Sequence, residues 1–223
     1  MGSASTRPMM EFWNLLNSPY AERKVKRTKH PDDVPMKLKT ATLLLAIPLF
    51  LIGAAQTQDT EPKLVQSHLI ETEIGGLVLV QELEVEASIS DVWNAYVTED
   101  GWKAWSAPHV EIDLRPGGTI RSHYGPDAEV GDPGTITLNI VNYVPERLIT
   151  LRAEFADHFP QFMKEDDENL MEVTTFEALG EKRTRITAYG VGYRDTPEYR
   201  GLIDFFIPAN EGVYLKLKEY LEK

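Results

Sequence analysis

A change of hydrophobic period near Thr196 constrains the fold of this chain more than any other feature. Beyond it, apolar residues recur about every three or four positions, as on one face of an α-helix. They are Leu202, Phe205, Phe206, Ala209, Val213, Leu217, Tyr220 and Leu221. Thr196 and Pro197 are typical of a helix start, because a hydroxyl caps the first turn and proline fits the first helical position. Pro208 lies within the stripe, so we expect two helices or a kink there.

The residues before this helix alternate between apolar and polar side chains, which is the pattern of half-buried β-strands. The alternating segments are 81–87, 109–114, 119–124, 134–143, 147–155, 170–179 and 183–193. An antiparallel sheet built from them has an apolar face, and the C-terminal stripe can cover it. The sequence therefore predicts an α+β fold in which a curved antiparallel sheet of about six to seven strands wraps around a long C-terminal helix.

Two short helices are expected after the first of these strands. Ser88 with Asp91 is a capping-box signature. The apolar residues that follow it share one helical face, and they are Ile89, Val92, Trp93 and Tyr96. The segment EDGWKAW at 99–105 continues as a second helical turn.

The segment 1–76 differs in character from the rest of the chain. Residues 1–35 are polar, basic and punctuated by proline, so we expect a disordered extension, or a mis-assigned start with Met36 as the true first residue. Residues 56–76 are polar and irregular, which indicates a linker with room for a short first strand. The folded domain is expected at 77–223.

Between the extension and the linker lies a short apolar segment. Lys37 and Lys39 precede the uncharged run Thr40–Ala55, which ends in small residues. That run is shorter than the roughly 20 residues that span a bilayer as a helix. We therefore predict a signal peptide at 36–55 with cleavage before Gln56, and hence a periplasmic or secreted protein; the alternative is an uncleaved membrane anchor.

The predicted mature chain is strongly acidic. With eight of the 23 basic and four of the 35 acidic residues in 1–55, residues 56–223 carry 15 basic and 31 acidic residues, a net charge of −16. Such a surface repels phosphate backbones, which argues against nucleic-acid binding. The chain has no cysteine, which excludes disulfides, thiolate chemistry and cysteine-ligated zinc.

Several phrases, taken in order, resemble the START-like (SRPBCC) superfamily with its helix-grip fold. They are ASISDVWNAYVTEDGWKAWSAP, IDLRPGGTIRSHYG, NYVPERLITLRAEF, VTTFEALGEKRTRITAYG and EGVYLKLKEYLEK. They look most like the branch of the activator of heat-shock-protein ATPase homologues, and they cover about 79–223. Two departures, Ser106 in place of a second tryptophan and Val213 in place of an aromatic residue, are expected to touch the walls of a cavity.

The resemblance implies an apolar cavity between the sheet and the last helix, which superfamily members use for hydrophobic ligands. The side chains expected to line or cover it are Trp93, Trp105, His123, Tyr124, Phe155, Phe159, Phe162, Tyr189, Phe205 and Phe206. The alternative for each is an ordinary filled core. Phe159, Phe162 and Met163 belong to HFPQFM at 158–163, which we expect to form a flap over the cavity mouth. Four charged residues form a polar floor or else surface ion pairs, namely Arg152, Glu154, Glu172 and Arg185.

Other polar groupings have plainer interpretations. His109, Glu111, Asp113 and His123 fit an N/O metal site geometrically, but a hydrated strand face explains them as well, and we expect no metal and no cofactor. Arg115-Pro116-Gly117-Gly118 predicts a tight turn, because proline and glycine suit its central positions. The acidic run KEDDEN at 164–169 indicates a solvated loop, with a weak cation site as the alternative.

These observations favour an exported protein that holds a hydrophobic small molecule or lipid, without chemistry. Membrane contact is expected only through the N-terminal segment if it stays uncleaved. Two alternatives remain open: an enzyme of the cyclase or hydrolase type that uses the same cavity with His123 or Tyr124 as acid or base, and a protein-binding module like a co-chaperone. No serine lies in a nucleophile-elbow pattern, so nothing indicates covalent catalysis.

Overall fold

The computed structural model describes residues 63–155 and 159–223. The predicted extension and the predicted signal or anchor segment lie outside this range. In the part that is described, no helix has the length and apolar character needed to cross a bilayer.

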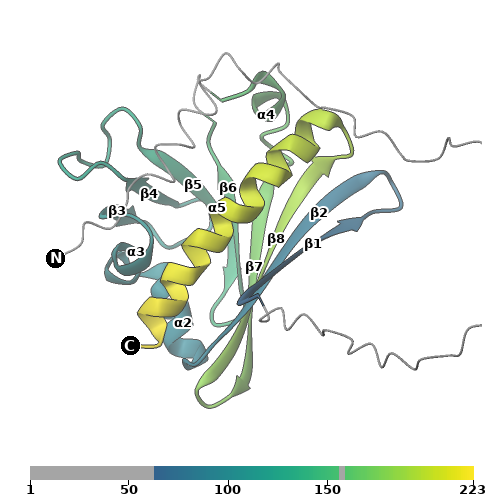
Figure 1. The fold of residues 1–223 in the computed structure, drawn as a ribbon. Helices are drawn as coiled ribbons and strands as arrows, with labels where there is room; N and C mark the ends of the chain where they lie inside the picture. The colour runs from purple at the N-terminus through teal and green to yellow at the C-terminus, as the bar shows by residue number, and fades with distance from the viewer. Residues whose placement is uncertain (1–62, 156–158) are drawn as a thin grey trace, which may run out of the picture. The chain divides into compact units, whose positions relative to one another are not determined.

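One antiparallel sheet of eight strands, in the order β1-β2-β8-β7-β6-β5-β4-β3, forms the framework of the domain (Figure 1). The strands are β1 (Val65–Glu71), β2 (Gly76–Val85), β3 (His109–Ile112), β4 (Thr119–His123), β5 (Ile136–Val144), β6 (Leu148–Ala153), β7 (Met171–Gly180) and β8 (Arg183–Arg194). After β2 the chain passes through α2 (Ile89–Val97) and α3 (Glu99–Trp105) to the far edge of the sheet. It then returns strand by strand to β8, which pairs with β2. The α+β prediction of a sheet against a long C-terminal helix is confirmed.

The sheet has eight strands where about six to seven were predicted, because β1 forms within residues 56–76, which were interpreted as a linker with room for a short first strand. β1 pairs only with β2 and forms an edge of the sheet. Leu69 and Ile70 are both exposed there, so the strand lacks the clean alternation of a half-buried strand. An edge strand with little burial leaves only a weak periodic signal.

Local signals explain how the short elements begin and turn. Ser88 caps α2 by accepting a hydrogen bond from the Asp91 backbone N–H at 3.2 Å. A hydroxyl that accepts from the first turn is what the capping signature predicts. In the predicted turn, the Gly118 N–H donates to the Arg115 carbonyl at 2.8 Å. Gly117 takes a φ of 77° there, which favours glycine.

Helix α5 (Pro197–Leu221) lies across one face of the sheet (Figure 1), which we call the inner face. It is a single helix that continues through Pro208, so the alternative of two helices is wrong. Proline is the first helical residue as predicted, but the Thr196 side chain makes no capping hydrogen bond. The side chain of Gln81 on β2 supports the helix beside Pro208, because its amide donates to the Ile207 carbonyl at 3.2 Å.

The C-terminal half of α5 packs tightly. Leu217 is completely buried, and it belongs to a core cluster with residues of α2, α3 and the neighbouring strand ends. The aromatic members of this cluster include Trp93, Tyr96, Trp102, Trp105 and Phe176. Their rings lie close together, with centroids 5.0 Å apart for both Tyr96–Phe176 and Trp102–Trp105. We call this region the packed half.

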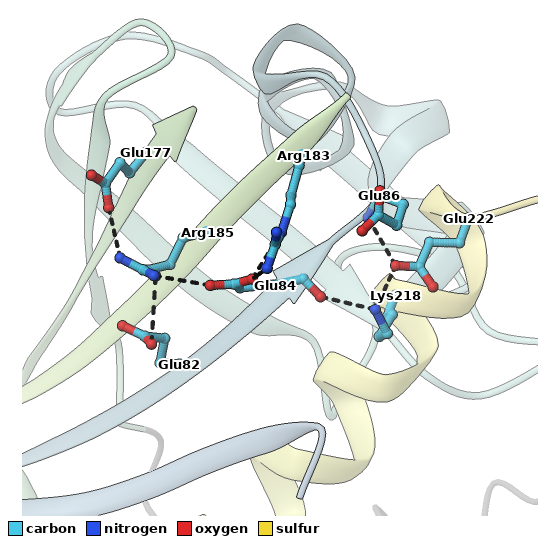
Figure 2. A network of polar contacts seen from close by, with 8 residues as sticks. All are labelled: Glu82, Glu84, Glu86, Glu177, Arg183, Arg185, Lys218 and Glu222. Atoms are coloured by element: carbon cyan, nitrogen blue, oxygen red, sulfur yellow. Dashed lines mark hydrogen bonds and ion pairs between the residues drawn. The ribbon is translucent and has the colours of Figure 1, made fainter. Parts of the chain in front are cut away.

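Polar contacts fasten the last turn of α5 to β2 (Figure 2). Lys218 Nζ donates to the Glu84 carbonyl at 2.9 Å, and a carboxylate oxygen of Glu222 accepts from the Glu86 backbone N–H at 2.8 Å. On the opposite face of the strands, Glu84 pairs with Arg183 and Arg185. Hydrogen bonds from Arg183 first, and then from Arg185, lower the pKa of the Glu84 carboxyl.

Candidate functional site

The N-terminal half of α5 does not close completely on the sheet. A cavity of about 200 Å³ lies between them, and we call this region the hollow half. Its lining comes from five strands, the segment between β6 and β7, and α5. The lining residues are Leu79, Gln81, Leu138, Leu151, Ala153, Phe155, Met163, Leu170, Met171, Glu172, Ala188, Gly190, Tyr193, Leu202, Phe206, Asn210 and Tyr214.

Small residues on β8 explain why a void remains. Ala188 and Gly190 are the inward-facing residues of the strand here, whereas Ile186 fills the same face in the packed half. A Cβ on Gly190 would lie 2.8 Å from the ring of Tyr193, so glycine lets this ring come close to the strand and form part of the cavity wall. The void is therefore a consequence of side-chain size along one strand.

The described part of the predicted flap, residues 159–163, borders the cavity. It overlaps the short helix α4 (Gln161–Glu165), whose Met163 is buried and lines the cavity. Met163 belongs to a small core cluster with Leu170, Tyr199 and Leu202, and the rings of Phe159 and Phe162 pack against that cluster. The position of these side chains fits a flap, and their contact with a ligand stays a prediction.

Asp166 fastens this segment to the rest of the domain. It is buried, accepts hydrogen bonds from Tyr199 and Arg194, and also accepts one from Asn169 at 3.3 Å. The hydrogen bond from Tyr199 is the main cause that lowers the pKa of the Asp166 carboxyl. Desolvation first, and the bond to Asp166 second, raise the pKa of Tyr199 to about 12. The interpretation of residues 164–169 as a solvated loop is therefore wrong for Asp166, which is an internal tether.

One polar group of the cavity is fully satisfied by its neighbours. Gln81 is buried, and its carbonyl oxygen accepts from Asn210 Nδ2 at 2.8 Å. Its amide also donates to Ser67 Oγ at 3.0 Å, and that hydroxyl donates to Glu211 at 2.9 Å. This chain of hydrogen bonds ties β1 and β2 to α5 and leaves Gln81 little capacity for a ligand.

Glu172 is different, because a carboxyl group lies among apolar and aromatic side chains with one partner. It lines the cavity from β7, and it accepts a hydrogen bond from Thr174 Oγ1 at 3.0 Å. Desolvation raises the pKa of the Glu172 carboxyl, and the Thr174 bond opposes this only in part. Among the described residues, no lysine, arginine or histidine forms an ion pair with it.

The charge of this carboxyl affects three buried tyrosines. Burial first, and the negative charge of Glu172 second, raise the pKa values of Tyr96, Tyr193 and Tyr214. Tyr193 and Tyr214 line the cavity with Glu172, whereas Tyr96 belongs to the aromatic cluster of the packed half. The hydroxyl of Tyr96 is buried without a hydrogen-bond partner in the described structure, which costs free energy there.

The remaining predicted pocket residues divide between the two halves. Phe155 and Phe206 line the cavity. Phe205 is not among the lining residues, although its ring centroid lies 5.7 Å from that of Phe206. Trp93 and Trp105 lie in the packed half, where Trp105 Nε1 donates to the Ala95 carbonyl at 2.9 Å.

His123, Tyr124 and Tyr189 lie away from the cavity lining. The His123 ring is held by the Gly125 N–H at 2.9 Å and the Pro133 carbonyl at 3.2 Å, and the Tyr124 hydroxyl lies 3.3 Å from Ser106 Oγ. Tyr189 follows Ala188 on β8 and so points to the other face of the sheet. Alternation within a strand therefore excludes Tyr189 from a cavity on the inner face.

The two family departures also lie outside the cavity lining. Ser106 bonds Tyr124, and Val213 packs against the core cluster of the packed half. The expectation that both touch cavity walls is wrong, because that half of the interface is filled.

The polar residues around β3 and β4 remain a strand surface. His109 and His123 are direct partners across the two strands, and Arg121 pairs with Glu111 at 3.0 Å. Within residues 63–155 and 159–223, no three histidine or acidic side chains gather as metal ligands would. Of the proposed polar floor, Glu172 lines the cavity, whereas Arg185 forms ion pairs with Glu82, Glu84 and Glu177.

Sequence reasoning did not single out Gln81 as a cavity residue, and it gave Glu172 only as one member of a polar floor, with a surface ion pair as the alternative. A signal was present, since each occupies an inward position of a strand whose other inward residues are mainly apolar. A polar residue at such a position is a candidate for a buried functional group.

One protein family matches most of the described domain. The sequence model of the family described as activator of Hsp90 ATPase homolog 1-like protein matches residues 86–222. No curated protein matches the chain.

Three solved structures are similar at low identity. The Aha1 dimer from Colwellia psychrerythraea has 16% identity and a TM-score of 0.49, and the match covers 65% of this chain and 96% of that one. Protein Ms6760 from Mycobacterium smegmatis has 20% identity and a TM-score of 0.48, with 70% and 96% covered. The conserved protein of unknown function EF2215 from Enterococcus faecalis has 16% identity and a TM-score of 0.47, with 71% and 78% covered.

Proposed function

This chain belongs to the family of activator of Hsp90 ATPase homolog 1-like proteins, and we propose that it binds a hydrophobic small molecule in the cavity of the hollow half. The observation that carries the proposal is the cavity itself. Its wall is mainly aliphatic and aromatic, with a few polar groups, which is the usual make-up of a ligand site.

The size of the cavity limits the occupant. The cavity measures about 200 Å³. One water-sized group takes up about 30 Å³ in a liquid, so the space holds about six or seven non-hydrogen atoms. That volume suits a small molecule, or one end of a longer one, rather than a whole lipid. His123 and Tyr124 do not contribute to the lining, so the proposal assigns them no chemistry.

Native mass spectrometry of the full chain purified from its own host tests this proposal. We expect a mass adduct of a small molecule that denaturing conditions remove. Ala188→Leu fills the cavity from β8 and should abolish the adduct, whereas Ala178→Leu at an exposed position of β7 should keep it. An adduct that persists in Ala188→Leu, or no adduct on any form, would contradict binding in this cavity.

We also propose that the protein is exported. Support comes from the sequence alone, namely the lysines at 37 and 39 before the uncharged run Thr40–Ala55. N-terminal sequencing of protein isolated from its host should give Gln56 as the first residue. A chain that retains residues 1–55 would refute cleavage at that point.

A further inference from the structure

A single carboxyl group lies in the wall of the cavity, which is otherwise apolar and aromatic apart from the mutually bonded amides of Gln81 and Asn210. Glu172 extends from the inner face of β7, where its direct strand partners are Leu151 on β6 and Gly190 on β8. One carboxylate oxygen accepts a hydrogen bond from Thr174, and no basic side chain of the described residues pairs with the group. An ionised carboxylate in such a place lacks its counter-charge.

Two tyrosines line the cavity together with Glu172, and their side chains suit a cation. Tyr193 comes from β8 and Tyr214 from α5, and burial first and the negative charge of Glu172 second raise the pKa values of both phenols. Tyr214 is only 4% exposed, and it lines the cavity together with Tyr193. Phenol rings attract an ammonium group through their faces, and their hydroxyl oxygens accept hydrogen bonds from it. The acidic net charge of the chain also favours the approach of cations.

We propose that the occupant of the cavity is a small amphipathic amine whose ammonium group pairs with Glu172 while its hydrocarbon body contacts Phe155, Leu202 and Phe206. This inference rests on the proposed ligand-binding function and adds the chemical class of the ligand. The ammonium supplies the missing counter-charge of the carboxylate and a hydrogen-bond donor to the phenol oxygens. The apolar wall supplies the space for a chain of about six carbon atoms, given the cavity volume.

Protonation of Glu172 gives the proposal a second observable. Burial raises the pKa of this carboxyl in the empty protein, whereas an ammonium partner favours its ionised form. Binding of an amine should therefore release protons, and the affinity should rise with pH as the carboxyl ionises. The affinity of an uncharged alcohol should not rise in this way.

Isothermal titration of the full chain with hexylamine, 1-hexanol and hexanoate provides the test. We expect hexylamine to bind at least tenfold more tightly than 1-hexanol at pH 7, and hexanoate to bind least. Glu172→Gln should reduce hexylamine affinity to that of 1-hexanol while 1-hexanol binding remains, which also shows that the variant is folded. Glu177→Gln, an exposed change on the outer face of the same strand, should leave every affinity unchanged.

Three results have distinct meanings in this experiment. Equal affinities for hexylamine and 1-hexanol in the wild-type chain would overturn the amine proposal but support the ligand-binding function. An amine preference that survives Glu172→Gln would overturn the role of Glu172. Failure of every probe to bind would overturn the proposed function and the amine proposal together.

Discussion

The same three strands cross both halves of the interface under α5, and they carry different residues in each. In the packed half, β2, β7 and β8 present Leu83, Phe176 and Ile186, which are paired side by side and almost completely buried. In the hollow half, the next two inward rows are Gln81, Ala188 and Thr174, and then Leu79, Gly190 and Glu172. Large apolar residues fill the first half, whereas the second carries mainly small or polar residues beside Leu79, and a void remains there.

This difference shows how one helix serves two purposes. The C-terminal half of α5 holds the domain together through Leu217 and the aromatic cluster, and the polar contacts of Lys218 and Glu222 fasten its end. The N-terminal half of α5 packs less completely on the sheet, and its side chains line one side of the cavity. Stability should therefore depend mainly on the packed half, and ligand binding on the hollow half.

The sharpest test of this division compares two leucines of the same helix. Leu217→Ala removes a completely buried side chain from the packed half. We expect it to lower the free energy of unfolding by about 4 kcal/mol. Leu202→Ala truncates a side chain that already borders a void, so it should cost only about 2 kcal/mol. Chemical denaturation of both variants measures the difference, and equal losses would contradict the contrast.

Enlarging an alanine should have opposite effects in the two halves. Ala95→Leu forces bulk into the filled core of the packed half, and it should cost about 1–3 kcal/mol. Ala188→Leu enters the cavity, so its stability should stay the same or rise by about 1 kcal/mol. Thermal unfolding checks both, and a large loss in Ala188→Leu would mean that the hollow half has no room.

The Glu172 carboxyl should change how the free energy of unfolding depends on pH. The folded-state pKa of Glu172 is raised above its ordinary value of 4.5, so the folded protein holds this proton more tightly than the unfolded chain. Below pH 4.5 the carboxyl is protonated in both states, so Glu172 does not lower the stability of the fold. As the pH rises above 4.5, the folded state becomes progressively less stable because of this group. Glu172→Gln should be more stable than the wild-type chain by about 1 kcal/mol at pH 7, with no gain near pH 4.

Chemical denaturation of Glu172→Gln and the wild-type chain between about pH 4 and pH 7 measures this difference in stability. Glu177→Gln is the matched control on the outer face. The control should change stability by less than about 0.5 kcal/mol throughout. A Glu172→Gln variant that tracks the wild-type chain at every pH would place the carboxyl in solvent.

The smallest effect is expected from the surface network of Figure 2. Arg183 is about half exposed, with 54% of its side chain accessible, and it pairs with Glu84. Arg183→Gln should cost less than about 1 kcal/mol, and the cost should shrink with added salt, because exposed ion pairs are screened. Ligand affinity should not change, since the side chains of Arg183 and Glu84 lie on the face of the sheet opposite the cavity. A loss that exceeds that of Leu202→Ala would show that surface charges hold the helix in place.

The framework of the fold could be predicted from the sequence because its signals are periodic. Alternation located the strands from β2 to β8, and the capping residue Ser88 located α2. The edge strand β1 was harder to identify, since its exposed Leu69 and Ile70 break the alternation. Pro208 predicted two helices or a kink, but α5 is one helix through this residue. The side chain of Gln81 donates a hydrogen bond to the Ile207 carbonyl beside it.

The candidate site could be predicted less well than the fold. A cavity forms where the side chains between sheet and helix are too small to fill the space, and their combined size is not visible in a periodic pattern. Aromatic content suggested Trp93 and Trp105, yet these fill the packed half, while Phe155 and Phe206 border the void. The size of the neighbours decides the outcome, and Ala188 and Gly190 are as decisive as any aromatic residue. Polarity at inward strand positions, as in Gln81 and Glu172, is the signal that sequence reasoning can use.

Methyl-detected NMR of the full chain during titration with 1-hexanol can show whether a ligand enters the hollow half. We expect shifts for methyl groups that line the cavity, in Leu79, Leu151, Met163 and Leu202, and none for Val85, Val92 and Leu217 in the packed half. The absence of shifts at the lining methyl groups, or equal shifts in both halves, would contradict a ligand-accessible void under the N-terminal half of α5.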